Sequence, residues 1–225
     1  MKTKIIFEDN DILVCIKPAG FAVQSAKVSS GDMESELKSY LKRKTGNTYL
    51  GIVHRLDQPV RGVMVYAKNE KSAASLSKQV QSGVDKSMCK YYEALVYGDM
   101  TADKGTLTDY LIKDAKSNSS KVTNESDKRA KKAVLDYDVL ERLTSEDGSA
   151  YCKLGIHLQT GRHHQIRVQF AHIGHPLLGD QKYGNERSAS LSTALNIRNI
   201  ELEAARLEFI HPSTGEKMIF DTKKY

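Results

Sequence analysis

The chain has 225 residues, three cysteines and a formal net charge of +6. Its length suits a single hydrophobic core and no long Pro, Gly or Ser-rich linker divides it, so we expect one domain over residues 1–225. No apolar run approaches the roughly 20 residues that cross a bilayer and no signal peptide is visible, so we expect a cytoplasmic protein with no membrane partner. We expect it to be a monomer whose cysteines are reduced thiols in the core. Its positive net charge suits a polyanion as partner.

The first part of the chain alternates short apolar runs with a helical pattern. Residues 4–7 and 12–16 are apolar and flank the polar residues 8–11, which favours a hairpin. Apolar side chains then recur at helical spacing from Met33 to Leu41. Gly46 follows and can supply the left-handed residue at a helix end. The sequence therefore predicts a hairpin followed by a helix.

The remaining elements follow the same rules. Residues 63–67 form an apolar run typical of a buried strand, and helical spacing before Gly83 predicts a second helix. The basic stretch at residues 113–132 predicts a long hairpin loop. Further strands are expected at residues 91–97, 105–110, 133–140, 152–158, 201–209 and 217–221. Because strands outnumber helices and many connections are short, we expect an α+β fold, with a mixed, mainly antiparallel sheet and helices packed on it.

One carboxylate stands out at residues 54–68. The sequence His-Arg-Leu-Asp-Gln-Pro-Val-Arg-Gly precedes the apolar strand and places Asp57 between Arg55 and Arg61. A loop held by a rigid strand is a common place for catalytic residues. The alternative is that Asp57 only pairs with one of these arginines in a tight turn.

A second segment, residues 160–180, favours the catalytic interpretation. It contains Gly-Arg-His-His-Gln-Ile-Arg followed by Gly-His-Pro-Leu-Leu-Gly-Asp. In this order, the two segments closely resemble the catalytic and arginine motifs of the RluA-like family of pseudouridine synthases. Residues 90–96 and 16–20 are similar to the Lys-x-Tyr-x-Ala strand and the Lys-Pro-x-Gly turn of that family. The resemblance covers the chain almost from end to end and implies a sheet bent around a central cleft.

The resemblance implies an RNA substrate and a reaction that needs a carboxylate. Uridine becomes pseudouridine when the C1′–N1 bond breaks, the uracil turns, and C5 joins C1′. Burial near cations keeps an aspartate ionised and excludes the water that would hydrolyse the sugar. Asp57 has this role by resemblance, as a nucleophile or as a base at the ribose. No glycine-rich phosphate loop is present, so no nucleotide cofactor is expected.

The resemblance also assigns Arg167 as the partner of Asp57. A guanidinium can hold a carboxylate by two hydrogen bonds and lower its pKa. In a helix over residues 163–173, Arg167 and His164 would share a face that looks into the cleft. The alternative is an arginine on the surface of a basic helix.

Apolar residues of the same predicted helix form a separate stripe. Ile166, Phe170 and Ile173 would be its buried residues. Ile166 could be an apolar wall beside the uracil or simply a core residue. Tyr92 lies where the family motif has its tyrosine, so it is the candidate for stacking on the flipped base. A core strand aromatic is the alternative.

Several cations are candidates for holding the RNA. Arg55 matches the family, whereas Val60 and Arg61 stand where the family commonly has Thr-Ser. Arg162, Lys68 and residues 113–132 are further candidates for phosphate contacts, with a solvated surface as the alternative. With the Lys-Pro turn starting at residue 17, we expect no separate RNA-binding module ahead of it.

The histidines of residues 157–175 invite a metal hypothesis. No Cys or carboxylate joins them at a recognised ligand spacing, and a helix would turn His163 and His164 about 100° apart. We therefore expect no metal and interpret His164 as an RNA contact.

Three functions remain distinguishable: an RNA isomerase, an inactive RNA-binding protein of the same fold, and a small hydrolase that pairs Asp57 with a histidine such as His54. The isomerase is the leading hypothesis, with rRNA or tRNA as its substrate.

Overall fold

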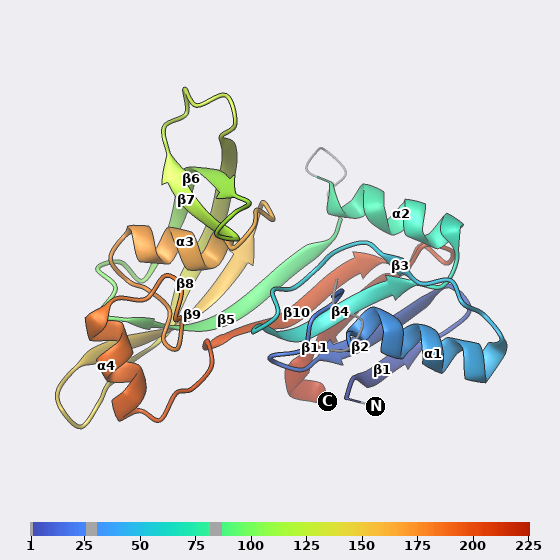
Figure 1. The fold of residues 1–225 in the computed structure, drawn as a ribbon, viewed down its shortest axis with the longest axis horizontal. Coiled ribbons are helices and arrows are strands. Elements are labelled where there is room, and N and C mark those ends of the chain that lie inside the picture. Colours follow the sequence, from blue (N-terminus) through green and yellow to red (C-terminus); the bar gives the residue numbers. More distant parts are fainter. Residues whose placement is uncertain (1, 26–30, 82–86) are drawn as a thin grey trace. The chain divides into compact units, whose positions relative to one another are not determined.

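The computed structural model describes residues 2–25, 31–81 and 87–225. The chain divides into two compact units, one made of Met1–Lys90 with Ala204–Tyr225 and the other of Tyr91–Glu203. Strands β5 (Cys89–Tyr97) and β10 (Leu202–Ile210) contribute residues to both units. Figure 1 labels the strands and helices of the two units.

The first unit is a sheet with helices. Its strands are β1 (Lys4–Glu8), β2 (Ile12–Lys17), β4 (Arg61–Ala67) and β10, in that order, with β3 (Gly51–Ile52) beside β4 and β11 (Lys217–Asp221) beside β10. The pairs β1–β2, β2–β4, β3–β4 and β10–β11 are antiparallel. Its helices are α1 (Met33–Thr45), α2 (Glu70–Val80) and the final 3-10 turn Thr222–Lys224.

Both faces of this sheet are buried, which explains the unbroken apolar runs of β2 and β4. Val14 and Val65 pack with Leu76 of α2. On the opposite face, the Tyr66 hydroxyl contacts the sulfur of Met33 in α1 at 3.8 Å. Each such apolar side chain contributes about 1.5–3 kcal/mol to folding through its burial. The core of this unit therefore lies in two layers, one on each side of the sheet.

The helices of the first unit begin and end where the sequence provides caps. Asp32 accepts the N–H of Ser35 at the start of α1, and Gly46 ends the helix at φ 74°. Asn69 caps α2 by accepting the N–H of Ser72. The predicted end of α2 at Gly83 lies outside the described residues.

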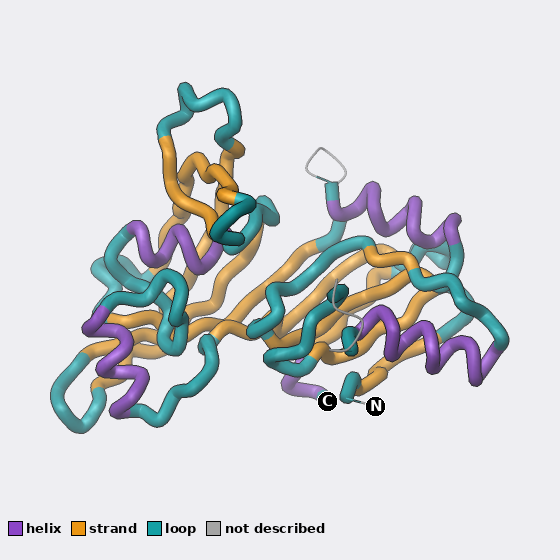
Figure 2. Tube along the Cα trace, in the orientation of Figure 1, coloured by secondary structure: helices purple, strands orange, loops and turns teal. Residues whose placement is uncertain are grey.

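The second unit is an antiparallel sheet with two helices, and Figure 2 shows the course of its strands and helices. Its strand order is β5, β9 (Ala150–Leu158), β8 (Lys131–Thr144), β6 (Lys104–Asp114) and β7 (Ser119–Thr123). Helix α3 (Gln165–His172) packs against β6 and β7, and α4 (Glu186–Ala194) follows it in the chain. Val168 of α3 packs with Leu111 and Ala133. The expected α+β fold with a mainly antiparallel sheet is confirmed.

Two sequence predictions in this unit are wrong in detail, and one helix was missed. Residues 113–132 are not one loop, because β7 pairs with β6 and buries Ser120. Helix α4 was not predicted, since its few apolar residues give little periodicity and its start depends on a capping box at Asn185. Ile173 is 38% exposed and not part of a buried stripe, because α3 ends one residue earlier.

The three cysteines carry free thiols, and Cys15 and Cys152 are buried, as expected for core residues. Within the described ranges, no helix has the length and apolar character to cross a membrane.

Candidate active site

Asp57 lies on the loop between β3 and β4, in the first unit. Its neighbours Leu56 and Val60 are buried and hold the loop on the core, whereas Asp57 itself is half-buried. The Asp57 carbonyl accepts the N–H of Val60 at 3.0 Å, which closes a turn. The predicted position of the carboxylate on a fixed loop ahead of a buried strand is therefore confirmed.

His54 fixes the place where this loop leaves the sheet. β3 pairs with β4 only through Gly51 and Ile52. Beyond this pair, the His54 side chain connects the loop to β4, since its Nε2 accepts the N–H of Val65 at 3.1 Å. Burial, and then the positive charge of Lys90, lower the pKa of His54 well below its usual value, so the ring is neutral.

This geometry argues against a hydrolase that uses His54 as its base. Because Nε2 accepts a backbone N–H, the ring proton resides on Nδ1. Neither nitrogen then offers a lone pair for taking a proton from water.

Lys17 is the second anchor of the loop. Its side chain is fully buried, and Nζ donates to the carbonyls of Gln58 at 2.8 Å and Pro18 at 2.9 Å. Burial lowers the pKa of Lys17 to about 8, and the negative charge of Asp57 acts in the opposite direction. The Lys-Pro turn noted in the sequence therefore places a buried cation next to the loop of the candidate nucleophile.

The low pKa of Lys17 predicts how stability depends on pH. Between about pH 8 and the ordinary lysine value of 10.5, the unfolded chain binds the proton that the folded chain has released. Unfolding free energy therefore rises with pH in this window, by at most about 1.4 kcal/mol per pH unit. Denaturant titrations should show this rise in the wild type relative to Lys17→Met. A difference between the two proteins that does not vary with pH would contradict the assignment.

Gly62 allows β4 to begin close to a neighbouring strand. Its φ is 145°, and a Cβ there would lie 2.4 Å from the carbonyl oxygen of Ala204 in β10. Only glycine fits this approach. The glycine therefore marks a tight strand contact next to Arg61.

In the second unit, Arg167 is buried and forms a two-pronged ion pair with Asp180. Nε donates to Oδ2 at 2.8 Å and Nη2 donates to Oδ1 at 2.7 Å. Burial opposes ionisation of Asp180, but the hydrogen bonds from Arg167 and from the N–H groups of Lys182 and Tyr183 outweigh it, so the pKa of Asp180 is lowered. Asp180 belongs to the second sequence motif, but its pairing with Arg167, 13 positions earlier, does not follow from sequence patterns.

His164 differs from its predicted position. It precedes α3 in the left-handed conformation, φ 55°, and is buried. Its ring stacks on His163 with centroids 3.8 Å apart, so the predicted 100° separation of these rings is wrong. The physical reason is that Gln165 Oε1 accepts the N–H of Arg162 at 3.0 Å, which starts the helix later than residue 163.

Tyr92 and Ile166 are both buried in the second unit. Tyr92 follows the alternation predicted for β5, since Tyr91 lies on the opposite face and stacks on His157 at 4.8 Å. Ile166 lies in the first turn of α3, where every residue from 165 to 170 is buried. The roles proposed for both side chains remain predictions.

The candidate RNA-binding cations differ in how exposed they are. Arg55 and Arg61 are exposed. Arg162 is half-buried and its Nε donates to the Lys132 carbonyl at 2.9 Å. Lys68 is buried and pairs with a carboxylate of β1 at 2.8 Å, so its suggested phosphate contact is wrong. The basic side chains between residues 113 and 132 are all exposed, namely Lys113, Lys116, Lys121, Lys128, Arg129, Lys131 and Lys132.

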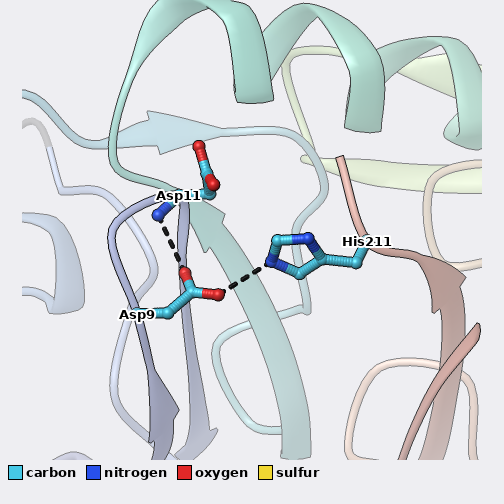
Figure 3. Close-up of side chains that lie close together, drawn as sticks. All are labelled: Asp9, Asp11 and His211. Atoms are coloured by element: carbon cyan, nitrogen blue, oxygen red, sulfur yellow. Dashed lines mark hydrogen bonds and ion pairs between the residues drawn. The ribbon is translucent and has the colours of Figure 1, made fainter. Parts of the chain in front are cut away.

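Asp9, Asp11 and His211 bring possible metal-ligand atoms within 4.8 Å of one another (Figure 3). Nδ1 of His211 accepts the N–H of Thr214 at 3.1 Å, so Nε2 carries the ring proton and donates it to Asp9 at 2.8 Å. A metal at this site would need the lone pair of Nε2, which is protonated here. Asp11 accepts the Ser72 hydroxyl at 3.0 Å. The group fits a structural brace between the β1–β2 turn, α2 and the end of β10.

Comparison with known proteins identifies the family. The profile of the RNA pseudouridylate synthase family matches residues 11–172. The chain belongs to this family. A ribosomal large subunit pseudouridine synthase D from Pasteurella multocida is 36% identical over 222 residues, which cover 95% of this chain and 65% of that protein. An uncharacterized RNA pseudouridine synthase from Aquifex aeolicus is 35% identical, with 98% of this chain and 69% of that protein covered.

These relatives are longer than the chain, which spans about two thirds of their length. Among solved structures, human RNA pseudouridylate synthase domain containing 4 superimposes with a TM-score of 0.77 over 97% of this chain and 87% of that one, at 23% identity. This likeness shows that the two proteins share a fold.

Proposed function

We propose that this protein is an RNA pseudouridine synthase. The observation that carries the proposal is that a chain of this family holds Asp57 on a loop anchored by a buried lysine and a buried histidine. An inactive RNA-binding protein would have no need for an ionisable group on a loop fixed in this way. We also propose that residues 1–225 act as one catalytic domain, because each unit carries one of the two long motifs.

The proposed reaction moves the glycosidic bond and needs no cofactor. The C1′–N1 bond breaks, the uracil turns, and C1′ bonds to C5, which then loses its proton while N1 gains one. Asp57 acts as the catalytic carboxylate, by adding to the substrate or by removing a ribose proton. We assign Arg167 as the cation that pairs with this carboxylate and Tyr92 as the ring that stacks on the uracil.

The proposed substrate is structured RNA, with rRNA as the first candidate and tRNA as the second. The name of the Pasteurella multocida relative supports rRNA. Arg55, Arg61, Arg162 and His164 are proposed to contact the RNA, and Ile166 to line the base. We propose that the protein works as a cytoplasmic monomer.

The test is a tritium-release assay on RNA labelled at uridine C5, because C5 loses its hydrogen when it bonds to C1′. Purified protein is incubated with rRNA and tRNA from cells that lack the gene, and pseudouridine is then mapped at nucleotide resolution. Release from one RNA class at a discrete site supports the proposal and identifies the substrate. RNA binding without release from either class favours the inactive RNA-binding protein.

Exposed lysines just before β8 and at its start provide a test of how the RNA is held. We expect the triple variant Lys128→Gln, Lys131→Gln and Lys132→Gln to reduce the magnitude of the slope of log affinity against log salt by about 2. The reason is that a protein with fewer phosphate contacts releases fewer counterions when it binds RNA. Exposed helical lysines changed in the same way, Lys42, Lys71 and Lys78, are the matched control. Equal slopes for wild type and the first triple would mean that these side chains are only solvated.

Arg61 tests the departure from the family pattern. Arg61→Ser restores a family-like residue and removes an exposed cation beside the candidate nucleophile. We expect weaker binding or lower activity on the native RNA, while isomerisation of a saturating short oligonucleotide persists, because positioning and chemistry are separable. Equal losses on both substrates would instead give Arg61 a part in the chemical step.

A further inference from the structure

Tyr183 connects three parts of the second unit through one hydroxyl group and one ring. Its hydroxyl accepts the N–H of Ser120 in β7 at 2.8 Å and lies 2.7 Å from Nδ1 of His164. A phenol has a single proton to donate. Since the Ser120 bond uses a lone pair, the phenol proton is available for His164, whose own ring proton is then on Nε2.

The Tyr183 ring faces the guanidinium of Arg167. The guanidinium carbon lies 5.0 Å from the ring centroid, within the range of a cation–π contact. Asp180 holds the Nε and Nη2 edge of the same guanidinium and also accepts the backbone N–H of Tyr183 at 3.2 Å. One edge and one face of Arg167 are therefore fixed by a segment of four residues.

The same segment also fastens the turn of the β6–β7 hairpin. Lys182 Nζ donates to the carbonyls of Ser117 at 2.9 Å and Asn118 at 3.2 Å. Ser120 Oγ lies 2.9 Å from Nδ1 of His163. The hairpin and Arg167 are thus both positioned by residues 180–183.

We propose that Tyr183 is a positioning residue with two separable parts. Its ring orients Arg167 for the chemical step, and its hydroxyl ties the basic β6–β7 hairpin to His164, so that the hairpin is held ready for RNA. This proposal rests on the proposed function, which gives Arg167 and the hairpin their roles. Without this hydrogen bond, the hairpin would lose conformational entropy each time RNA binds, which would weaken binding.

The test compares Tyr183→Phe, which keeps the ring, with Tyr183→Leu, which removes the ring and the hydroxyl. We expect Tyr183→Phe to raise the KM for structured RNA by about fivefold, the size of one lost hydrogen bond, with kcat within about twofold of wild type. Tyr183→Leu should raise KM similarly and also lower kcat by about tenfold or more, as expected when an oriented group is released. Tyr40→Phe, whose hydroxyl contacts Glu8 in the first unit, is the matched control.

Hydrogen exchange at the Ser120 amide gives a readout that does not depend on catalysis. Its protection should fall in both Tyr183 variants and persist in Tyr40→Phe. Unchanged protection and KM in Tyr183→Phe would overturn the hydroxyl part, and equal kcat values for Phe and Leu would overturn the ring part. Tyr183→Met replaces the Leu variant if the latter does not fold. A wild type that releases no tritium refutes the proposed function, whereas the exchange data still test the tie.

Discussion

Asp57→Asn is expected to abolish pseudouridine formation, with a fall in rate of about a thousandfold or more. The amide keeps the shape of the side chain but has neither the charge nor the basicity that the reaction needs. The backbone turn from Asp57 to Val60 and the hydrogen bonds of Lys17 to Gln58 and of His54 to Val65 use no atom of the Asp57 carboxylate, so the fold should persist. Tritium release and RNA affinity should be measured on the same preparation.

Asp138→Asn serves as the control, because Asp138 is an exposed carboxylate on β8. RNA affinity of Asp57→Asn should stay close to that of the wild type, which separates loss of chemistry from loss of binding. Activity within tenfold of the wild type would remove Asp57 from its catalytic role.

The first unit follows closely from the sequence because its determinants are local. β2 and β4 are buried on both faces, and an unbroken apolar run is the sequence pattern that predicts such burial. Helix α1 shows both its apolar spacing and its end at Gly46. The loop of Asp57 was also predictable, since a buried strand follows it.

The second unit depends more on contacts between distant residues. The left-handed conformation of His164 belongs to a cluster with Tyr183, 19 residues later, and helical periodicity alone predicted a regular helix there. Strand β7 is short and mostly polar, and it is fixed by pairing with β6. The first unit has a contact of this kind too, since the hydrogen bond from Lys17 to Gln58 spans 41 positions of the chain. Sequence patterns identify which residues belong to a site, but such long-range pairs set their orientation.

Arg167→Met is expected to cost both stability and activity. Its guanidinium forms a buried ion pair with Asp180, whose side chain is 0% exposed. Removing one partner of a buried pair typically costs about 3–5 kcal/mol, because the remaining charge is left without compensation. Arg167→Lys should recover only part of this loss, since an ammonium cannot make both parallel hydrogen bonds. Denaturant unfolding measures the change in stability.

A double variant separates the structural role of Arg167 from its role in the reaction. Arg167→Met with Asp180→Leu removes both charges, so stability should recover much of the loss, as for other buried pairs replaced by apolar residues. Activity should nevertheless stay at the level of Arg167→Met alone, because the cation proposed to serve Asp57 is still missing. Asp180→Asn, which retains Arg167 but weakens its orientation, should lose less activity than either. Recovery of activity together with stability in the double variant would mean that Arg167 acts only by holding the fold.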